Sequence, residues 1–126
     1  MATTHAFVGL ALASAYAAVG GEYATAAAAG ALAGGLFPDL DLLAEHRKTL
    51  HFPEYYSVLA VLAVVVAAAA TLPVTVGVVG FLVSAAVHSA SDVFGGGTEA
   101  RPWLAQDERG VFLHTQGRWA APRRYV

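Results

Sequence analysis

The stretch YYSVLAVLAVVVAAAATLPVTVGVVGFLVSAAVHSAS, residues 55–91, decides the fold of this chain. It contains no Asp, Glu, Lys or Arg, so a helix made from it has no charged face to turn towards water. The Thr71-Leu72-Pro73 segment divides it, because proline favours a turn or the first position of a helix. The stretch therefore predicts two apolar helices, at roughly 55–71 and 74–93, joined as a hairpin.

The N-terminal part of the chain has the same organisation. Between residues 6 and 38 the only charged residue is Glu22, which follows two glycines. This break predicts two more helices, at roughly 5–19 and 23–37. Each helix is short for a bilayer core of about 30 Å, which takes about 20 helical residues to cross, so we expect tilted helices or a locally thinned bilayer.

The composition favours a membrane protein. Of the 126 residues, 57% are hydrophobic and only 13% are charged, whereas soluble domains carry about 25% charged residues. We therefore expect an all-α fold: an integral membrane four-helix bundle of two helical hairpins in residues 1–94. A soluble bundle with buried apolar helices is the alternative. The net charge of −2 gives no sign of a nucleic-acid partner, and the absence of cysteine excludes disulfides and thiolate ligands.

Residues 95–126 have a different character and form a polar C-terminal tail. Three consecutive glycines open it at residues 95–97. The segments VFLHT and GRWAA flank Gln116 and Gly117, a pattern that predicts a small hairpin. The Pro-Arg-Arg-Tyr-Val ending is compatible with a native chain that continues past Val126.

The distribution of basic residues predicts which side of the membrane each connection faces. Four spans would place the N-terminus, the 38–54 loop and the tail on one side. All seven Lys and Arg residues lie on that side, and basic residues mark the cytoplasmic face. We therefore expect a multi-pass protein of the cell membrane with both termini in the cytoplasm. The sequence is compatible with an oligomer.

The same topology gathers the residues that could bind a metal at this cytoplasmic face. They are His5, Asp39, Asp41, His46, His51, His88 and Asp92. His88 and Asp92 are four apart and share a helix face, and ionisable groups in a membrane segment usually have a function. A single aspartate would suffice to cap a helix after Pro38. The presence of both Asp39 and Asp41 therefore favours a role in chemistry. Asp39 as a helix cap remains an alternative.

This set of side chains predicts a divalent metal site. Imidazole and carboxylate ligands without sulfur suit Zn²⁺ first, and also Mn²⁺ or Fe. The residues exceed the three protein ligands of one open catalytic site, so they fit one ion with supporting residues, or two ions. Asp39 or Asp41 would be a ligand or the base that takes a proton from water. Arg47 and Lys48 would bind an anionic substrate such as a phosphate group.

The ordered set of these motifs resembles a known family. Thr4-His5, Gly35-x-x-Pro38-Asp39-Leu40-Asp41, His46-Arg47, His51 and His88-x-x-x-Asp92 are similar to the YdjM-type membrane-bound metal-dependent hydrolases. The series is also distantly similar to zinc-dependent phospholipase C and nuclease P1, whose clustered zinc ions hydrolyse phosphoesters. The resemblance implies that His5, Asp39 or Asp41, His46 or His51, His88 and Asp92 are metal ligands. Relatives carry Thr-His-Ser at the second loop histidine, where this chain has Leu50-His51-Phe52.

Taken together, these features predict a membrane-bound metal-dependent hydrolase at the cytoplasmic face. Its substrate would be a phosphoester, either a small molecule or a membrane lipid, attacked by metal-activated water. The alternative is a non-catalytic membrane protein in which a structural metal joins the two hairpins and the tail binds a partner. Plentiful Arg, Asp and Glu beside a single Lys are compatible with an archaeal source.

Overall fold

Four α-helices dominate the computed structural model, which describes residues 2–98, 104 and 106–123. They are α1 (Ala2–Ala18), α2 (Ala24–Leu36), α3 (Pro53–Ala69) and α4 (Pro73–Ser91). Their ends lie within a few residues of the predicted limits, so the mostly helical fold is confirmed. Pro53 and Pro73 occupy the first turns of their helices, where a missing N–H removes no intrahelical hydrogen bond.

Among the residues that the structure describes, two short 3-10 helices follow α2 and α4. The first, η1 (Pro38–Leu43), follows α2 directly, and the second, η2 (Asp92–Gly95), follows α4. Pro38 lies at the start of η1 and cannot donate a hydrogen bond back to α2. The tighter helix therefore continues the chain compactly and carries both aspartates of the Pro-Asp-Leu-Asp motif.

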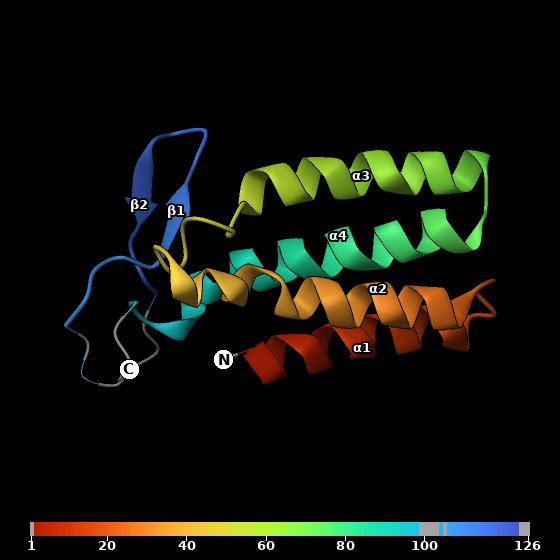
Figure 1. Ribbon diagram of the computed structural model, residues 1–126, viewed down its shortest axis with the longest axis horizontal. Helices are drawn as coiled ribbons and strands as arrows, with labels where there is room; N and C mark the ends of the chain where they lie inside the picture. The colour runs from red at the N-terminus through yellow and green to blue at the C-terminus, as the bar shows by residue number, and fades with distance from the viewer. Residues whose placement is uncertain (1, 99–103, 105, 124–126) are drawn as a thin grey trace.

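Helix α4 is the centre of the bundle. It packs against α3 on one side and against α1 and α2 on the other (Figure 1). Glycines allow the close approach of α2 and α4: a methyl group added at Gly34 would overlap the main chain of Phe81, and one at Gly30 would overlap that of Gly77. Such contacts between small residues are typical of membrane helices.

The tail contains the predicted hairpin. Strand β1 (Val111–Leu113) pairs antiparallel with β2 (Arg118–Ala120). The hairpin lies at the end of the bundle where the N-terminus is found, beyond the start of α3 (Figure 1). It therefore stands next to the connection between α2 and α3.

The membrane prediction is supported for part of the chain. Within the described residues, two segments are long and apolar enough to cross a bilayer, Ala24–Leu43 and Pro73–Gly95, and Pro53–Ala69 is a shorter apolar helix. The outer face of α3 exposes valines and leucines to between 46% and 65%: Val58, Leu59, Val61, Leu62, Val64, Val65 and Val66. A water-exposed helix would place polar side chains on such a face.

Candidate metal centre

The predicted ligand residues lie together at one end of the bundle. Helix α1 begins there, α2 ends there in η1, α3 begins there, and α4 ends there in η2 (Figure 1). This arrangement follows from the order of two antiparallel hairpins. It brings residues that are distant in sequence, such as His5 and Asp92, to within 3.4 Å of each other.

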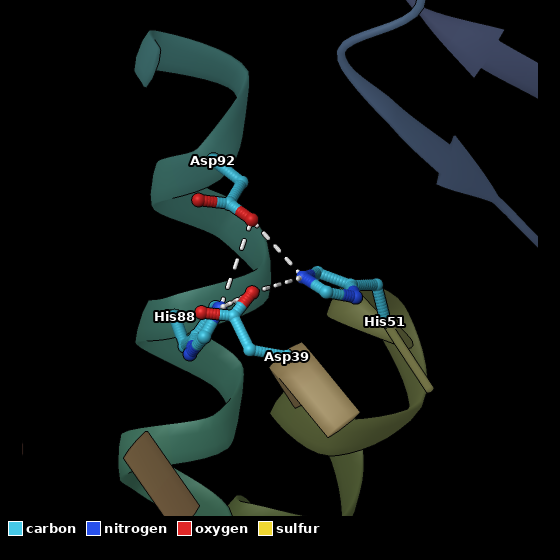
Figure 2. A group of neighbouring side chains, drawn as sticks. All are labelled: Asp39, His51, His88 and Asp92. Atoms are coloured by element: carbon cyan, nitrogen blue, oxygen red, sulfur yellow. Dashed lines mark hydrogen bonds and ion pairs between the residues drawn. The ribbon is translucent and has the colours of Figure 1, made fainter. Parts of the chain in front are cut away.

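Four of these residues form a buried cluster: Asp39, His51, His88 and Asp92 (Figure 2). One ligand atom from each lies within 4.8 Å of the others. The Nε2 atom of His51 is 3.0 Å from an oxygen of Asp92 and 4.0 Å from one of Asp39. The Nε2 atom of His88 is 3.4 Å from Asp39 and 3.7 Å from Asp92.

Both histidines of the cluster are fixed through the other ring nitrogen. The Nδ1–H of His88 donates to the main-chain carbonyl of Gly35, at 2.7 Å. The Nδ1–H of His51 donates to the Oδ2 atom of Asp41, also buried, at 2.8 Å. Metal-binding histidines almost always have a partner of this kind, which sets the tautomer and the ring orientation. Both Nε2 atoms consequently face the two carboxylates of the cluster.

Asp39 faces the cluster and does not cap a helix. The N-terminal capping position of η1 is Phe37, and no side-chain capping bond is formed there. The Oδ1 atom of Asp39 instead approaches both imidazoles. Of the two roles predicted for Asp39, the geometry favours the one in the site.

Asp41 and His46 lie beside the four-residue cluster. The two oxygens of Asp41 contact the Nδ1 atoms of His46 and His51, each at 2.8 Å. Oδ2 of Asp41 also accepts from the main-chain N–H of Leu50. These three residues could themselves hold an ion, but the contacts made by Asp41 are those of a group that orients His51.

His5 lies at the edge of the cluster. Its ring stacks on that of His88 with 3.8 Å between the centroids. Its Nε2 atom faces Asp92, which thereby contacts three imidazoles: those of His5, His51 and His88. Asp92 is therefore the residue around which the site is organised.

Arg47 is buried, which the sequence did not predict. Its Nη1 atom donates to the carbonyl oxygens of Asp92, Gly96 and Gly110, and its Nε atom is 3.4 Å from the Asp92 carboxylate. The guanidinium thus joins the loop before α3 to the end of α4 and to the tail. Its predicted contact with a substrate stays a prediction.

Lys48 lies outside the cluster. Its ammonium group pairs with Glu45 at 2.7 Å and lies 4.8 Å from the centre of the Phe112 ring. The side chain is about one-third exposed. The role of Lys48 in substrate binding likewise stays a prediction.

The tail supports the loop that carries His51. The Nε2–H of His114 donates to the carbonyls of Lys48 and His51, at 2.8 and 3.1 Å. The main-chain N–H of Phe112 donates to the carbonyl of Arg47. His114 has no potential partner at helical spacing in the sequence, so only its position on the predicted hairpin could have indicated this contact.

The charge of the site fits a divalent cation. Three buried carboxylates, those of Asp39, Asp41 and Asp92, meet one buried guanidinium, that of Arg47. With neutral histidines this leaves an excess of two negative charges, which is costly away from water unless a cation balances it. The Nε2 atom of His88 is buried and has no hydrogen-bond partner, as expected of an atom that coordinates a metal.

The carboxylates of the site also favour a proton on His51. Burial lowers the pKa of His51, but the hydrogen bonds to Asp41 and Asp92 outweigh burial and raise its pKa above the ordinary value. The imidazolium form of His51 is therefore stabilised between two carboxylates. A metal ion that binds to Nε2 has to displace this proton.

No protein-family model, curated protein or solved structure that we compared with this chain matches it.

Proposed function

We propose that this protein is a membrane-bound metal-dependent hydrolase that acts on phosphoesters. The observation that carries the proposal is the orientation of His51 and His88. Each has its Nδ1 atom occupied by an anchoring acceptor and its Nε2 atom turned towards the carboxylates of Asp39 and Asp92. Supported histidines of this kind, combined with carboxylates, are typical of zinc sites. We also propose membership of the YdjM-type family, on the ordered motifs given above.

A divalent cation at this site, Zn²⁺ in the first instance, would polarise the phosphoester and activate a water molecule for attack. Asp92 and the two imidazoles would hold the ion. Asp39 lies farther from the His51 Nε2 atom than Asp92 does, at 4.0 Å against 3.0 Å, and we propose that it completes the coordination or accepts a proton from the water. Asp41, with both oxygens occupied, would orient His51.

The positive charge of Arg47 supports an anionic substrate. The guanidinium lies next to Asp92, where it would offset the excess of carboxylates as a phosphate approaches. Lys48, which is more exposed, would contact the part of the substrate that stays in water. Both roles extend the prediction made from the sequence.

The apolar outer face of α3 and the two segments long enough to span support a membrane location. We propose that all four helices lie in the cell membrane and that the metal centre faces the cytoplasm. The distribution of basic residues is the reason for placing the metal centre on the cytoplasmic side.

The burial of the site favours one alternative. His51 and His88 are 0% and 1% exposed, and the cluster joins η1, the loop before α3 and the end of α4. A structural metal that fixes these segments, with a partner-binding tail, is the second candidate. It predicts a bound metal and no hydrolysis.

The test begins with the metal content of the protein purified in detergent. We expect at least one equivalent of a divalent metal per chain, and hydrolysis of phosphomonoesters or phosphodiesters after reconstitution with Zn²⁺ or Mn²⁺. His88→Ala and Asp92→Asn should lose both metal and activity. Glu22→Gln, which removes a carboxylate at the opposite end of the bundle, should lose neither.

The outcomes separate the two candidates. A wild-type protein without bound metal contradicts both. A protein that binds metal and unfolds when it is chelated, but hydrolyses no phosphoester in a broad panel, contradicts the hydrolase and supports the structural role.

A further inference from the structure

An apolar groove lies between helices of the bundle, next to the metal centre on the side of the α3–α4 turn. It has a volume of about 290 Å³, close to the lower limit of pockets that bind small molecules. Leu12, which is 42% exposed, forms part of its rim, so the groove opens to the outer surface of the helices. Its walls come from three helices: α1 with Gly9, Ala13 and Tyr16, α2 with Ala27 and Ala31, and α4 with Val76, Val79 and Ser84.

One end of this groove, the end with Gly9 and Ser84, lies next to the metal centre. Three lining residues are each one helical turn from a residue of the site: Gly9 from His5, Ala31 from Gly35, and Ser84 from His88. Residues four apart in a helix share a face. The groove therefore continues the face of each helix that carries the centre or its support.

Small residues shape the groove: Gly9 lets α1 pack closely on α2 and α4 at one end, and alanines line the wall. Gly9 lies over Ser84 and the main chain of Ala31, where a methyl group would overlap both. Ala13 and Ala31, which are buried, line its inner wall. Larger side chains at Ala13 or Ala31 would extend into the groove.

Ser84 is a polar group placed among these apolar walls. It is 3% exposed, and its hydroxyl has no hydrogen-bond partner. A buried hydroxyl without a partner costs free energy, and an apolar side chain of similar size would avoid that cost. Ser84 lines the groove one turn from His88, and its hydroxyl lies against Gly9 of α1.

We infer that the groove binds one hydrocarbon chain of a membrane lipid whose phosphate group lies at the metal centre. This inference rests on the proposed function and names its substrate class. The chain would enter over Leu12 and lie along α1 and α4, with its ester or ether oxygen near Ser84. From Gly9 to Tyr16 the groove extends about 10 Å along α1, at 1.5 Å per residue, so it holds part of one chain and the rest stays in the bilayer.

The test uses phosphatidic acid that carries a photoreactive diazirine on one acyl chain and a methylene in place of the ester oxygen of its phosphate, so that the lipid is not hydrolysed during labelling. The metal-loaded protein is incorporated into lipid nanodiscs, irradiated and digested, and the labelled peptides are identified by mass spectrometry. We expect label on residues 9–16 and 76–84, and little on the outer face of α3. Even labelling of all helices, or label mainly on α3, would overturn the inference.

Two pairs of variants show whether the groove itself holds the chain. Ala13→Leu and Val79→Phe place larger side chains in the groove, and each should reduce the labelling of its walls about tenfold. Ala11→Leu and Val78→Phe make the same changes at exposed positions of the same helices and should leave the labelling unchanged. Equal effects within each pair would overturn the inference, and two pairs keep the test valid if one groove variant misfolds.

A third comparison links the groove to the metal centre. Diacylglycerol with the same diazirine lacks the phosphate, so it should label the groove more weakly, and chelation should reduce only the labelling by phosphatidic acid. Equal labelling by both lipids would overturn the inference. If the metal-dependent labelling occurs and no phosphoester of the panel, natural phosphatidic acid included, is hydrolysed, the hydrolase proposal fails while the lipid site stands. If soluble phosphoesters are hydrolysed without groove labelling, the reverse holds.

Discussion

At the scale of single residues, the site depends on the two nitrogens of His51. Nδ1 is held by Asp41 and Nε2 faces Asp92 and Asp39. One imidazole thus connects a supporting carboxylate to the ligand cluster. His88 reaches the same arrangement with a main-chain acceptor, which a side-chain substitution cannot remove. Asp41 is therefore the supporting residue that can be tested directly.

Asp41→Asn should weaken metal binding about 10- to 100-fold, the usual effect of removing a residue that supports a ligand. Asp92→Asn should lower the affinity further, because Asp92 itself faces the ion. Isothermal titration of the metal-free protein with Zn²⁺ measures both affinities. Wild-type affinity in Asp41→Asn would show that Asp41 does not support the centre, and a larger loss than in Asp92→Asn would make it a ligand.

The raised pKa of His51 predicts opposite effects of pH on the metal-free and metal-loaded proteins. Its imidazolium stabilises the metal-free fold below the ordinary histidine pKa of about 6.5, and that contribution is lost as pH rises through the higher folded value. Metal binding displaces the same proton, so metal affinity should rise over this range.

The measurement is thermal unfolding in detergent, with and without metal, between about pH 6 and pH 9. We expect the Tm of the metal-free protein to fall with pH and the gain in Tm from added metal to grow. A gain that shrinks as pH rises would contradict the assignment of His51 as a ligand.

At the scale of elements, glycines determine how closely α2 and α4 approach. The carbonyl of Gly35 then reaches His88, and η1 brings Asp39 over the end of α4. The glycines of this interface are not equivalent. A methyl group at Gly34 would overlap the main chain of Phe81, whereas one at Gly77 would make an ordinary contact at 3.4 Å from Ala26.

Gly34→Ala should therefore destabilise the protein by about 1–3 kcal/mol, the usual cost of overpacking. It should also weaken metal binding, because α2 carries Gly35 and leads into η1. Gly77→Ala is the matched control and should be neutral or stabilising by up to about 1 kcal/mol, because alanine favours a helix. Unfolding midpoints in denaturant compare the two, and equal stabilities would contradict the close packing of α2 on α4.

Most helical elements could be predicted from the sequence because charge is absent from long, continuous stretches. The end of α1 was predicted from the two glycines before Glu22, and the start of α4 was predicted from Pro73. The 3-10 geometry of η1 could not be predicted, since it depends on how Pro38 and the end of α2 pack on α4. The burial of Arg47 also depends on tertiary structure: its acceptors are 45 to 63 residues away.

The membership of the site was predictable, whereas the roles within it were not. Hydropathy alone placed His5, Asp39, His51, His88 and Asp92 at one face. The division between residues in the cluster and those that support them depends on which ring nitrogen faces which oxygen. The spacing of residues in the sequence does not show which ring nitrogen faces which oxygen. His114 has no potential partner at helical spacing, so its contact could not be predicted in this way.

At the scale of the whole molecule, the bundle has an apolar outer surface and a polar centre at one end. This combination suits a protein that meets lipid along its sides and water at its ends. The chain contains no cysteine, so single introduced cysteines can report which surfaces meet water.

Gln116→Cys, in the hairpin turn, should react with a membrane-impermeant maleimide only from the cytoplasmic side. Ala70→Cys, in the α3–α4 turn, should react only from the opposite side, and Val65→Cys, on the outer face of α3, from neither. Inverted and right-side-out vesicles provide the two sides. Rapid labelling of Val65→Cys would indicate a soluble bundle, and labelling of the first two from the same side would contradict the four-span topology.

In our proposal one divalent cation lies among Asp39, His51, His88 and Asp92 and is held by His51, His88 and Asp92. Anomalous diffraction from crystals of the Zn²⁺-loaded protein tests it most directly. We expect a peak at about 2.0–2.2 Å from the Nε2 atoms of His51 and His88 and from a carboxylate oxygen of Asp92, with Asp39 either as a fourth ligand or next to the ion. A peak at the Nδ1 atom of His51, between Asp41 and His46, or no peak at this end of the bundle, would contradict the account.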